Sequence, residues 1–386
     1  MFILVFLSGK AQDSNHQIDL VDVGRSFLKG KKTQRIDSIP KRVGKLHISA
    51  LPVAGYTLQT GFAAVLSSNF AFYTSEHSQA NLSSILTSIT YSQYQQIIFP
   101  IQADIWTKGN KYNIITDWRY LKYPSLTYGL GGNTAADSGY NIDFGYLRLH
   151  QAILKTIAKD LYLGLGYDLD YFWNIREIDP PVGKETDYQR YGLHSTEWAS
   201  GVSFHFQYDS RRNQINPENG GYASISFRPN FTWLGSGSDW QSLLFDLRKY
   251  IRFPENTHNV LAIWSYDWFT TGGKPPYLLL PSTGWDAYSN TARGYIQGRY
   301  RSNNMVYLES EYRFGITGNG LLGGVVFANA QSFSQPGSGE YEYLIPGYGL
   351  GLRLSLNKFS RTNLCVDYGW GTHGSGGFFV NLGEVF

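Results

Sequence analysis

Apolar and polar residues alternate along most of the chain from Leu46 to its end. In segment 161–173 the odd-numbered positions are Leu, Tyr or Trp, whereas the even-numbered positions up to Asp170 are Tyr, Gly or Asp. Segments 202–209 and 348–356 alternate in the same way. A period of two is typical of β-strands that have one apolar and one polar face. The pattern therefore predicts an all-β chain.

Turn residues divide this region into about sixteen strands, because Gly, Asn and Asp clusters punctuate the alternating runs. The expected strands are 46–57, 62–74, 82–94, 96–107, 111–122, 142–157, 161–175, 196–209, 221–233, 240–252, 258–271, 305–316, 321–333, 344–357, 363–370 and 377–386. An even strand number in this range is typical of bacterial single-chain membrane barrels.

The connections between these strands fall into two classes. Those at Leu58–Gly61, Lys108–Asn110 and Ala158–Asp160 are tight, and those at Tyr123–Tyr140, Arg176–Ser195 and Gly272–Asn304 are long. Short turns at one end and long loops at the other are expected of an outer-membrane barrel.

The chemistry of the two faces distinguishes a membrane barrel from a soluble β-sandwich, which would also alternate. Asp168, Arg353 and Glu311 stand on the polar faces. Charges there would be very unfavourable in a dry core but are normal in a water-filled lumen. Mean hydropathy is −0.28, aromatics make up 16% of the chain, and glycine numbers 42. We therefore predict a transmembrane antiparallel β-barrel.

The loop Gly272–Asn304 is much longer than the roughly 2–5 residues of an ordinary hairpin turn. It contains Ala292-Arg293-Gly294-Tyr295, and the strand after it places four polar or charged residues on one face. These are Tyr307, Glu309, Glu311 and Arg313. A loop folded into the lumen would satisfy both sets of groups, so we predict an inward-folded loop.

The N-terminal segment has a different character. Residues 1–11 resemble the end of a secretory signal peptide, with a plausible cleavage after Ala11. Residues 12–45 form a polar, basic arm in which Val21–Leu28 could be a short helix. We interpret this arm as solvated and periplasmic, with contact to anionic lipid headgroups as the alternative. The barrel domain is expected over residues 46–386.

Charge and composition narrow the function classes. The formal net charge of +3 does not suggest nucleic-acid binding, and the single Cys365 excludes an intramolecular disulfide. The eight histidines lack metal-ligand spacing, and no Gly-x-Ser-x-Gly nucleophile elbow is present. We expect no enzyme, no cofactor and no metal.

Four motifs, in order, resemble the BamA/TamA family of bacterial surface-antigen barrels. They are Leu51-Pro-Val-Ala-Gly-Tyr56 with Thr60-Gly61, Asp209-Ser-Arg211-Arg-Asn213 with Pro217 and Gly220-Gly221-Tyr222, Ala292-Arg293-Gly294-Tyr295, and Gly377–Phe386. The resemblance covers 46–386. It departs from the family where members that insert or translocate proteins carry periplasmic POTRA domains, for which the residues before the first strand leave no room.

The resemblance implies roles for particular residues. Arg293, Gly294 and Tyr295 would form a loop lock, with Arg293 held by acids on the next two strands. Glu311 matches the first of these acids, whereas Asn329 stands where the second would be, and Glu309 could substitute for it. The alternative to a loop lock is that Arg293 is a solvated arginine on a surface loop. Arginine suits the role because its guanidinium binds carboxylates bidentately.

Two further sites follow from the resemblance. Asp209, Arg211, Pro217 and Gly220 would form the family's turn, where Asp209 either caps the turn or joins a lumenal ion pair. The last strand would pair with the first to close the barrel. On that last strand Phe378, Val380, Leu382 and Phe386 are expected to face outward, and Gly55 of the first strand would weaken the seam.

The function implied is a non-enzymatic accessory of outer-membrane protein assembly or export in a Gram-negative bacterium. Its partners would be outer-membrane lipid and other assembly proteins or client barrels. A passive pore or transporter for small solutes and a structural surface-antigen barrel are the alternatives.

Overall fold

The computed structural model describes residues 17–29, 44–75 and 80–386. The expected signal-peptide remnant (1–11) lies outside these residues, as does most of the basic arm (12–45). The helices are α1 (Leu20–Lys29) and α2 (Asp187–Gly192). The first nine strands are β1 (His47–Thr57), β2 (Gly61–Phe72), β3 (Ser83–Ser92), β4 (Ile97–Trp106), β5 (Tyr112–Lys122), β6 (Ser125–Thr127), β7 (Tyr140–Ala158), β8 (Leu161–Ile178) and β9 (Thr196–Asp209). The others are β10 (Gly220–Asn230), β11 (Trp240–Arg252), β12 (Val260–Gly273), β13 (Asn304–Gly315), β14 (Leu322–Phe333), β15 (Ile345–Asn357), β16 (Thr362–Trp370) and β17 (Gly376–Leu382).

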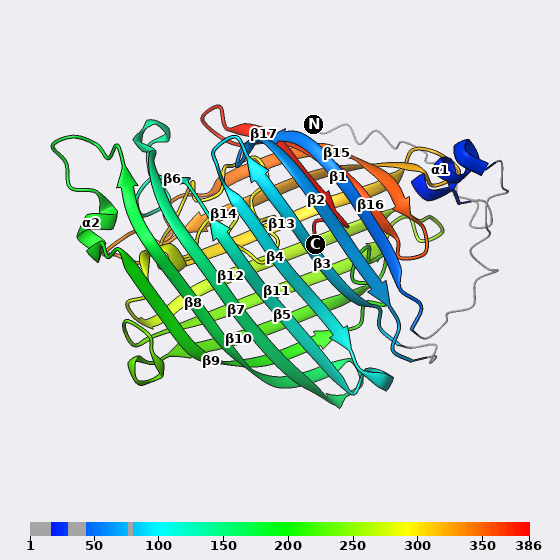
Figure 1. Ribbon diagram of the computed structural model, residues 1–386, viewed down its shortest axis with the longest axis horizontal. Coiled ribbons are helices and arrows are strands. Elements are labelled where there is room, and N and C mark those ends of the chain that lie inside the picture. Colours follow the sequence, from blue (N-terminus) through cyan, green and yellow to red (C-terminus); the bar gives the residue numbers. More distant parts are fainter. Residues whose placement is uncertain (1–16, 30–43, 76–79) are drawn as a thin grey trace.

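The strands form a tilted wall around a lumen (Figure 1). Each wall strand pairs antiparallel with the next along the chain, and the three-residue β6 adds to the edge of β7. The wall is a nearly closed barrel of 16 strands, which confirms the predicted fold class and strand number. Within the described residues, no helix has the length and apolar character to cross a membrane.

The two faces of the wall differ as the alternation predicts. On β8, Leu163 and Leu165 are exposed on the outside, whereas Asp168 and Asp170 are buried on the inside. On β15, Leu350 and Leu352 are exposed, and Arg353 is buried. The charged faces therefore line the lumen, and the apolar faces form the outer belt that a bilayer requires.

The connections alternate between two ends of the barrel. The end with residues 123–139, 179–195 and 274–303 is called the long-loop end, and the other is called the short-turn end. The turn at Leu58–Gly61, which resembles the short turns in length, lies at the long-loop end. There Gln59 O accepts from Gln96 Nε2 at 3.2 Å, and Gln59 Oε1 accepts from the backbone N of Gln297 at 3.1 Å. Loop length alone therefore did not assign this turn correctly.

Two short elements inside predicted loops were not anticipated. β6 follows β5 closely, and α2 begins at a capping box, in which Thr186 Oγ1 accepts from Gln189 N and Gln189 Oε1 accepts from Thr186 N. The spacing Thr-x-x-Gln was visible in the sequence and is a recognised helix start.

Helix α1 is docked against the short-turn end. Asp22 Oδ2 accepts from Lys358 Nζ at 2.7 Å, and Asp19 Oδ2 accepts from the backbone N of Lys358 at 2.8 Å. Lys358 belongs to the turn between β15 and β16, and both acids are buried. The start of the N-terminal arm is thus fixed to the wall by a buried ion pair.

Candidate functional site

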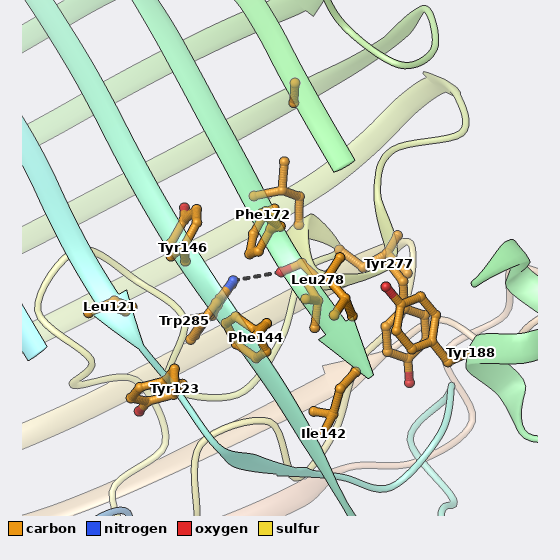
Figure 2. Packing of buried hydrophobic residues seen from close by; sticks show 14 of the residues in the cluster. Leu121, Tyr123, Ile142, Phe144, Tyr146, Phe172, Tyr188, Tyr277, Leu278 and Trp285 are labelled. Carbon is orange, nitrogen blue, oxygen red and sulfur yellow. Dashed lines mark hydrogen bonds between the residues drawn. The ribbon is translucent and has the colours of Figure 1, made fainter. Parts of the chain in front are cut away.

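The connection between β12 and β13, residues 274–303, folds into the lumen and is called the plug loop. Its first half packs on inward-facing aromatics of β7 and β8, among them Phe144, Tyr146 and Phe172 (Figure 2). Trp285 Nε1 donates to Leu278 O at 2.8 Å, which fixes the indole inside this cluster. An apolar half that is packed against the wall holds the loop in place.

Arg293 stands at the tip of the plug loop and is fully buried. Its Nη2 donates to Glu311 Oε2 at 2.6 Å and to Glu309, and its Nη1 donates to Asp367 on β16. Its guanidinium also lies 3.7 Å from the ring centre of Phe327. The structure therefore brings Arg293 together with Glu309 and Glu311 and adds a third acid, Asp367.

The electrostatics of this group are those of a buried ion cluster. Burial by itself lowers the pKa of Arg293, but Glu309, Asp367 and Glu311 raise it well above its ordinary value. The guanidinium therefore stays charged. A buried charge is costly unless it is paired. Loss of one member of the cluster would therefore leave an uncompensated charge on its partners.

Asn329 stands where the resemblance implies an acid, but it binds the backbone of the loop tip and not the Arg293 guanidinium. Its Nδ2 donates to Arg293 O at 3.0 Å. Gly294 has φ +111°, and a Cβ there would lie 2.8 Å from Trp370 O. Only glycine allows this close approach of loop tip to β16.

Tyr295 is buried between β15 and the loop that follows β16. Its hydroxyl donates to Pro346 O and accepts from Thr372 N, the latter at 2.9 Å. Arg293, Gly294 and Tyr295 thus contact four neighbouring strands or their ends, β13 to β16.

The ion cluster continues from the loop tip to the last residues. Arg353 donates to Asp367 and, at 2.7 Å, to Glu384 Oε2, and Arg313 donates to Glu311. The ion cluster consists of three arginines and four acids: Arg293, Arg313, Arg353, Glu309, Glu311, Asp367 and Glu384.

The expectation that Phe386 faces outward with β17 is wrong. The strand ends at Leu382, and residues 383–386, called the tail, turn into the lumen; Figure 1 marks the C-terminus within the outline of the wall. Phe386 is 3% exposed, stacks 5.1 Å from Trp264, and accepts through its O from Arg313 Nη2 at 2.9 Å. The ion cluster and this aromatic pocket together hold the tail inside. Phe378 and Val380 do face outward, and Leu382 is half-buried.

The turn between β9 and β10 crosses the short-turn end. Asp209 both caps this turn, by accepting from Arg211 N at 3.0 Å, and pairs with the Arg211 guanidinium at 2.8 Å. Asp209 therefore makes a turn-capping hydrogen bond and an ion pair at the same time. Pro217 is buried, and Gly220 has φ +101°, which closes the turn.

This turn reaches the opposite wall. Asn213 Nδ2 donates to Ser360 O in the β15–β16 turn at 3.0 Å, and Ile215 O accepts from Glu384 N at 2.9 Å. Asn290 of the plug loop donates to Val385 O at 2.7 Å. The tail is therefore held between the plug loop and the β9–β10 turn, and all three obstruct the lumen.

The seam between the first and last strands is unpaired. Among the described residues, β1 has a ladder only with β2, and β17 has one only with β16, although β1 and β17 lie next to each other. The expectation that the last strand pairs with the first is therefore wrong. The two strands meet at the long-loop end, where a Cβ on Gly377 would lie 2.3 Å from Leu58 Cγ. Gly55 lies within β1, opposite Ala63 of β2, with open space where its side chain would be.

Comparisons with known proteins agree on the architecture. BamA from Haemophilus ducreyi lacking POTRA domains 1–3 has 14% identity and a TM-score of 0.53, over 94% of this chain and 76% of that one. CdiB from Escherichia coli has 11% identity and a TM-score of 0.55, over 87% and 61%. CdiB from Acinetobacter baumannii has 12% identity and a TM-score of 0.54, over 89% of this chain and 60% of that one.

The chain spans less than two thirds of either CdiB chain. No protein-family model matches the chain, and no curated protein is detectably similar to it in sequence. At these identities the comparisons establish the barrel fold.

Proposed function

We propose that the protein resides in the outer membrane of a Gram-negative bacterium and acts there as a non-enzymatic accessory of outer-membrane protein assembly or export. The site of action is the seam between β1 and β17. No cofactor takes part, and the partners are outer-membrane lipid and other assembly proteins or client barrels.

The observation that carries this proposal is the absence of a ladder between β1 and β17. Unpaired amides and carbonyls in hydrocarbon are costly, so a barrel normally closes completely. A free strand edge is also a template for pairing with another strand. An unpaired seam is therefore suited to a transient contact with a client strand.

The lengths of the strands near the seam support the same role. β17 has seven residues and β16 has nine, whereas β7 has nineteen. A membrane β-strand needs about 9–11 residues to cross the hydrocarbon core. Of β1, β16 and β17, only β17 is shorter than this length, which favours local perturbation of the bilayer beside it.

The lumen contents support this role over that of an open pore. The plug loop, the tail and the β9–β10 turn all occupy the lumen, and the ion cluster ties the first two to β13, β15 and β16. The motifs at Arg293 and Asp209 resemble those of a family whose members insert or translocate proteins.

The test is a reversible seam lock. Leu58→Cys with Gly377→Cys, in a Cys365→Ser background, places two thiols at the contact where the strands meet. We expect that a host lacking the protein has less outer-membrane protein, that the reduced double variant restores it, and that the oxidised one does not. Leu58→Cys alone is the matched control and should restore it under both conditions.

Other outcomes identify the alternatives. Unchanged outer-membrane protein content in the deletion host contradicts the proposal. If that result comes with a bilayer conductance that rises when residues 284–302 are removed, the protein is a passive pore. If permeability is also unaltered, it is a structural surface barrel.

A further inference from the structure

A cavity of about 540 Å³ remains in the lumen between the plug loop and the wall formed by β1–β5. Pockets of roughly 300–1,000 Å³ are the size that holds small organic ligands. The plug loop contributes Trp285, Tyr288 and Ile296 to its lining. The cavity therefore lies directly against the plug loop.

The part of the cavity wall formed by β1–β3 is uncharged and combines aliphatic side chains with small polar ones. Its inward-facing residues on β1–β3 carry no charge and include Leu51, Val53, Val65 and Leu86. Val53 is directly opposite Val65 in the ladder, and each of the four is half-buried. The lumen face of β8, by contrast, carries Asp168 and Asp170. Apolar side chains on a lumen wall without a covering partner favour an apolar occupant.

The cavity reaches the seam. β1 contributes alternate residues to its lining, as expected of a strand face, whereas β17 and the tail contribute every residue from Phe378 to Phe386. A continuous run is what a free strand edge presents. Phe378 is 45% exposed on the outer face of the same strand. The cavity thus borders the edge of β17 that faces the seam.

The charged residues of the lining come from other parts of the wall, and its arginines are paired. Arg119 pairs with Asp117 at 2.7 Å, and Arg248 pairs with Asp246 at 2.6 Å. Arg211, also in the lining, pairs with Asp209. Each of these arginines already has its carboxylate, and Asp104 of β4 adds another carboxylate to the lining, which accepts from Asn113 Nδ2. These charges favour dipolar or zwitterionic groups over a net anion.

We propose that this cavity binds one alkyl chain of a membrane amphiphile that has a zwitterionic or uncharged head. The chain lies on Leu51, Val53, Val65 and Leu86, and the head lies toward the ion pairs of Arg119 and Arg248. The amphiphile enters through the unpaired seam. This binding site requires the seam to be open to the bilayer but does not depend on a role in assembly.

The experiment uses the full chain in phosphatidylcholine vesicles that contain a phosphocholine with a diazirine at the end of one acyl chain. After irradiation and proteolysis, mass spectrometry locates the adducts. We expect adducts on the inward-facing residues Val53, Val65 and Leu86 as well as on the outer belt. The inward-facing segment around Asp170 should remain unlabelled.

Variants of the apolar wall test the assignment. Val65→Asp should lower labelling of Val53 and Leu86 by roughly tenfold, because a carboxylate against an alkyl chain is strongly disfavoured. Val65→Thr keeps the side-chain volume and should lower labelling less than Val65→Asp does. It provides the test if the aspartate variant fails to fold. Val65→Ile should retain labelling, and heat-modifiable gel mobility reports folding of each variant.

Two results would overturn the proposal. One is labelling confined to outward-facing residues. The other is equal labelling of the cavity by a water-soluble diazirine, which would show that the lumen wall is simply wet. Val65→Thr should leave outer-membrane protein content unchanged if only amphiphile binding is affected, so this site and the proposed assembly role can fail separately.

Discussion

The single side chain of Arg293 connects the tip of the plug loop to several strands of the wall. Its planar guanidinium donates to three carboxylates that come from two strands, β13 and β16. A lysine would present one compact charge and could not match this fork geometry. The loop tip is therefore fixed in position as well as in charge.

Removing this guanidinium should destabilise the barrel markedly. Arg293→Ala leaves Glu309, Glu311 and Asp367 buried without their shared cation, for which we expect a loss of about 3–5 kcal/mol in the free energy of unfolding. Urea unfolding in detergent, followed by heat-modifiable mobility, measures it.

Arg299 provides the matched control on the same loop. It is buried but donates to Thr134 Oγ1 and Thr134 O, each at 2.7 Å. Because no buried acid loses its cation, Arg299→Ala should cost less, about 1–3 kcal/mol. Equal losses for the two variants would contradict the special role of Arg293.

The residues of the ion cluster could be predicted only in part. Glu309 and Glu311 share a face of the strand that follows the loop, so spacing placed them near Arg293. Asp367 was missed because it lies in a strand distant in sequence, although its place on the polar face of β16 was a usable signal. Phe386 was misassigned because period-two counting continues past the point where the strand ends.

At the scale of elements, α1 shows how a helix is attached to the wall. Lys358 lies in a turn between strands and is buried with Asp22 and Asp19. The helix is thus tied to the same β15–β16 turn that contacts the β9–β10 turn through Ser360.

Breaking that attachment should release the helix and leave the wall intact. In Lys358→Ala the buried carboxylate of Asp22 loses its cation, so undocking of the helix, which returns this carboxylate to water, is favoured. Hydrogen exchange of Leu20–Lys29 should then rise to that of an undocked segment, while β15 and β16 stay protected.

The control for this prediction is an exposed ion pair. Arg176→Ala removes a surface contact with Asp143 and should change stability by about 0–1 kcal/mol without affecting α1. Unchanged exchange in α1 of Lys358→Ala would show that the ion pair does not hold the helix.

Elements were predicted well where local pattern determines them. The strands β9 and β11 have the expected bounds because alternation and flanking turns mark them. The small helix α2 was missed although its capping box was present, since a long polar loop hides one short helical turn. The unpaired seam could not be predicted, because pairing between the first and last strands depends on the geometry of the whole wall.

The whole molecule is a barrel blocked inside and incomplete at one seam. The tail contacts both the plug loop and the β9–β10 turn. The ion cluster joins the plug loop and the tail to β13, β15 and β16. The short strand β17 and the cavity behind β1 lie on the same side. The features proposed to matter for function are therefore gathered around the seam.

Amide hydrogen exchange of the protein in phosphatidylcholine nanodiscs tests the seam most directly. Alternate amides of a strand point to opposite neighbours, so roughly half of those in β1 and in β17 should lack a partner. We predict that this fraction exchanges faster than the amides of β8 and β9, which have ladders on both sides. Protection of β1 and β17 equal to that of β8 and β9 would contradict the account.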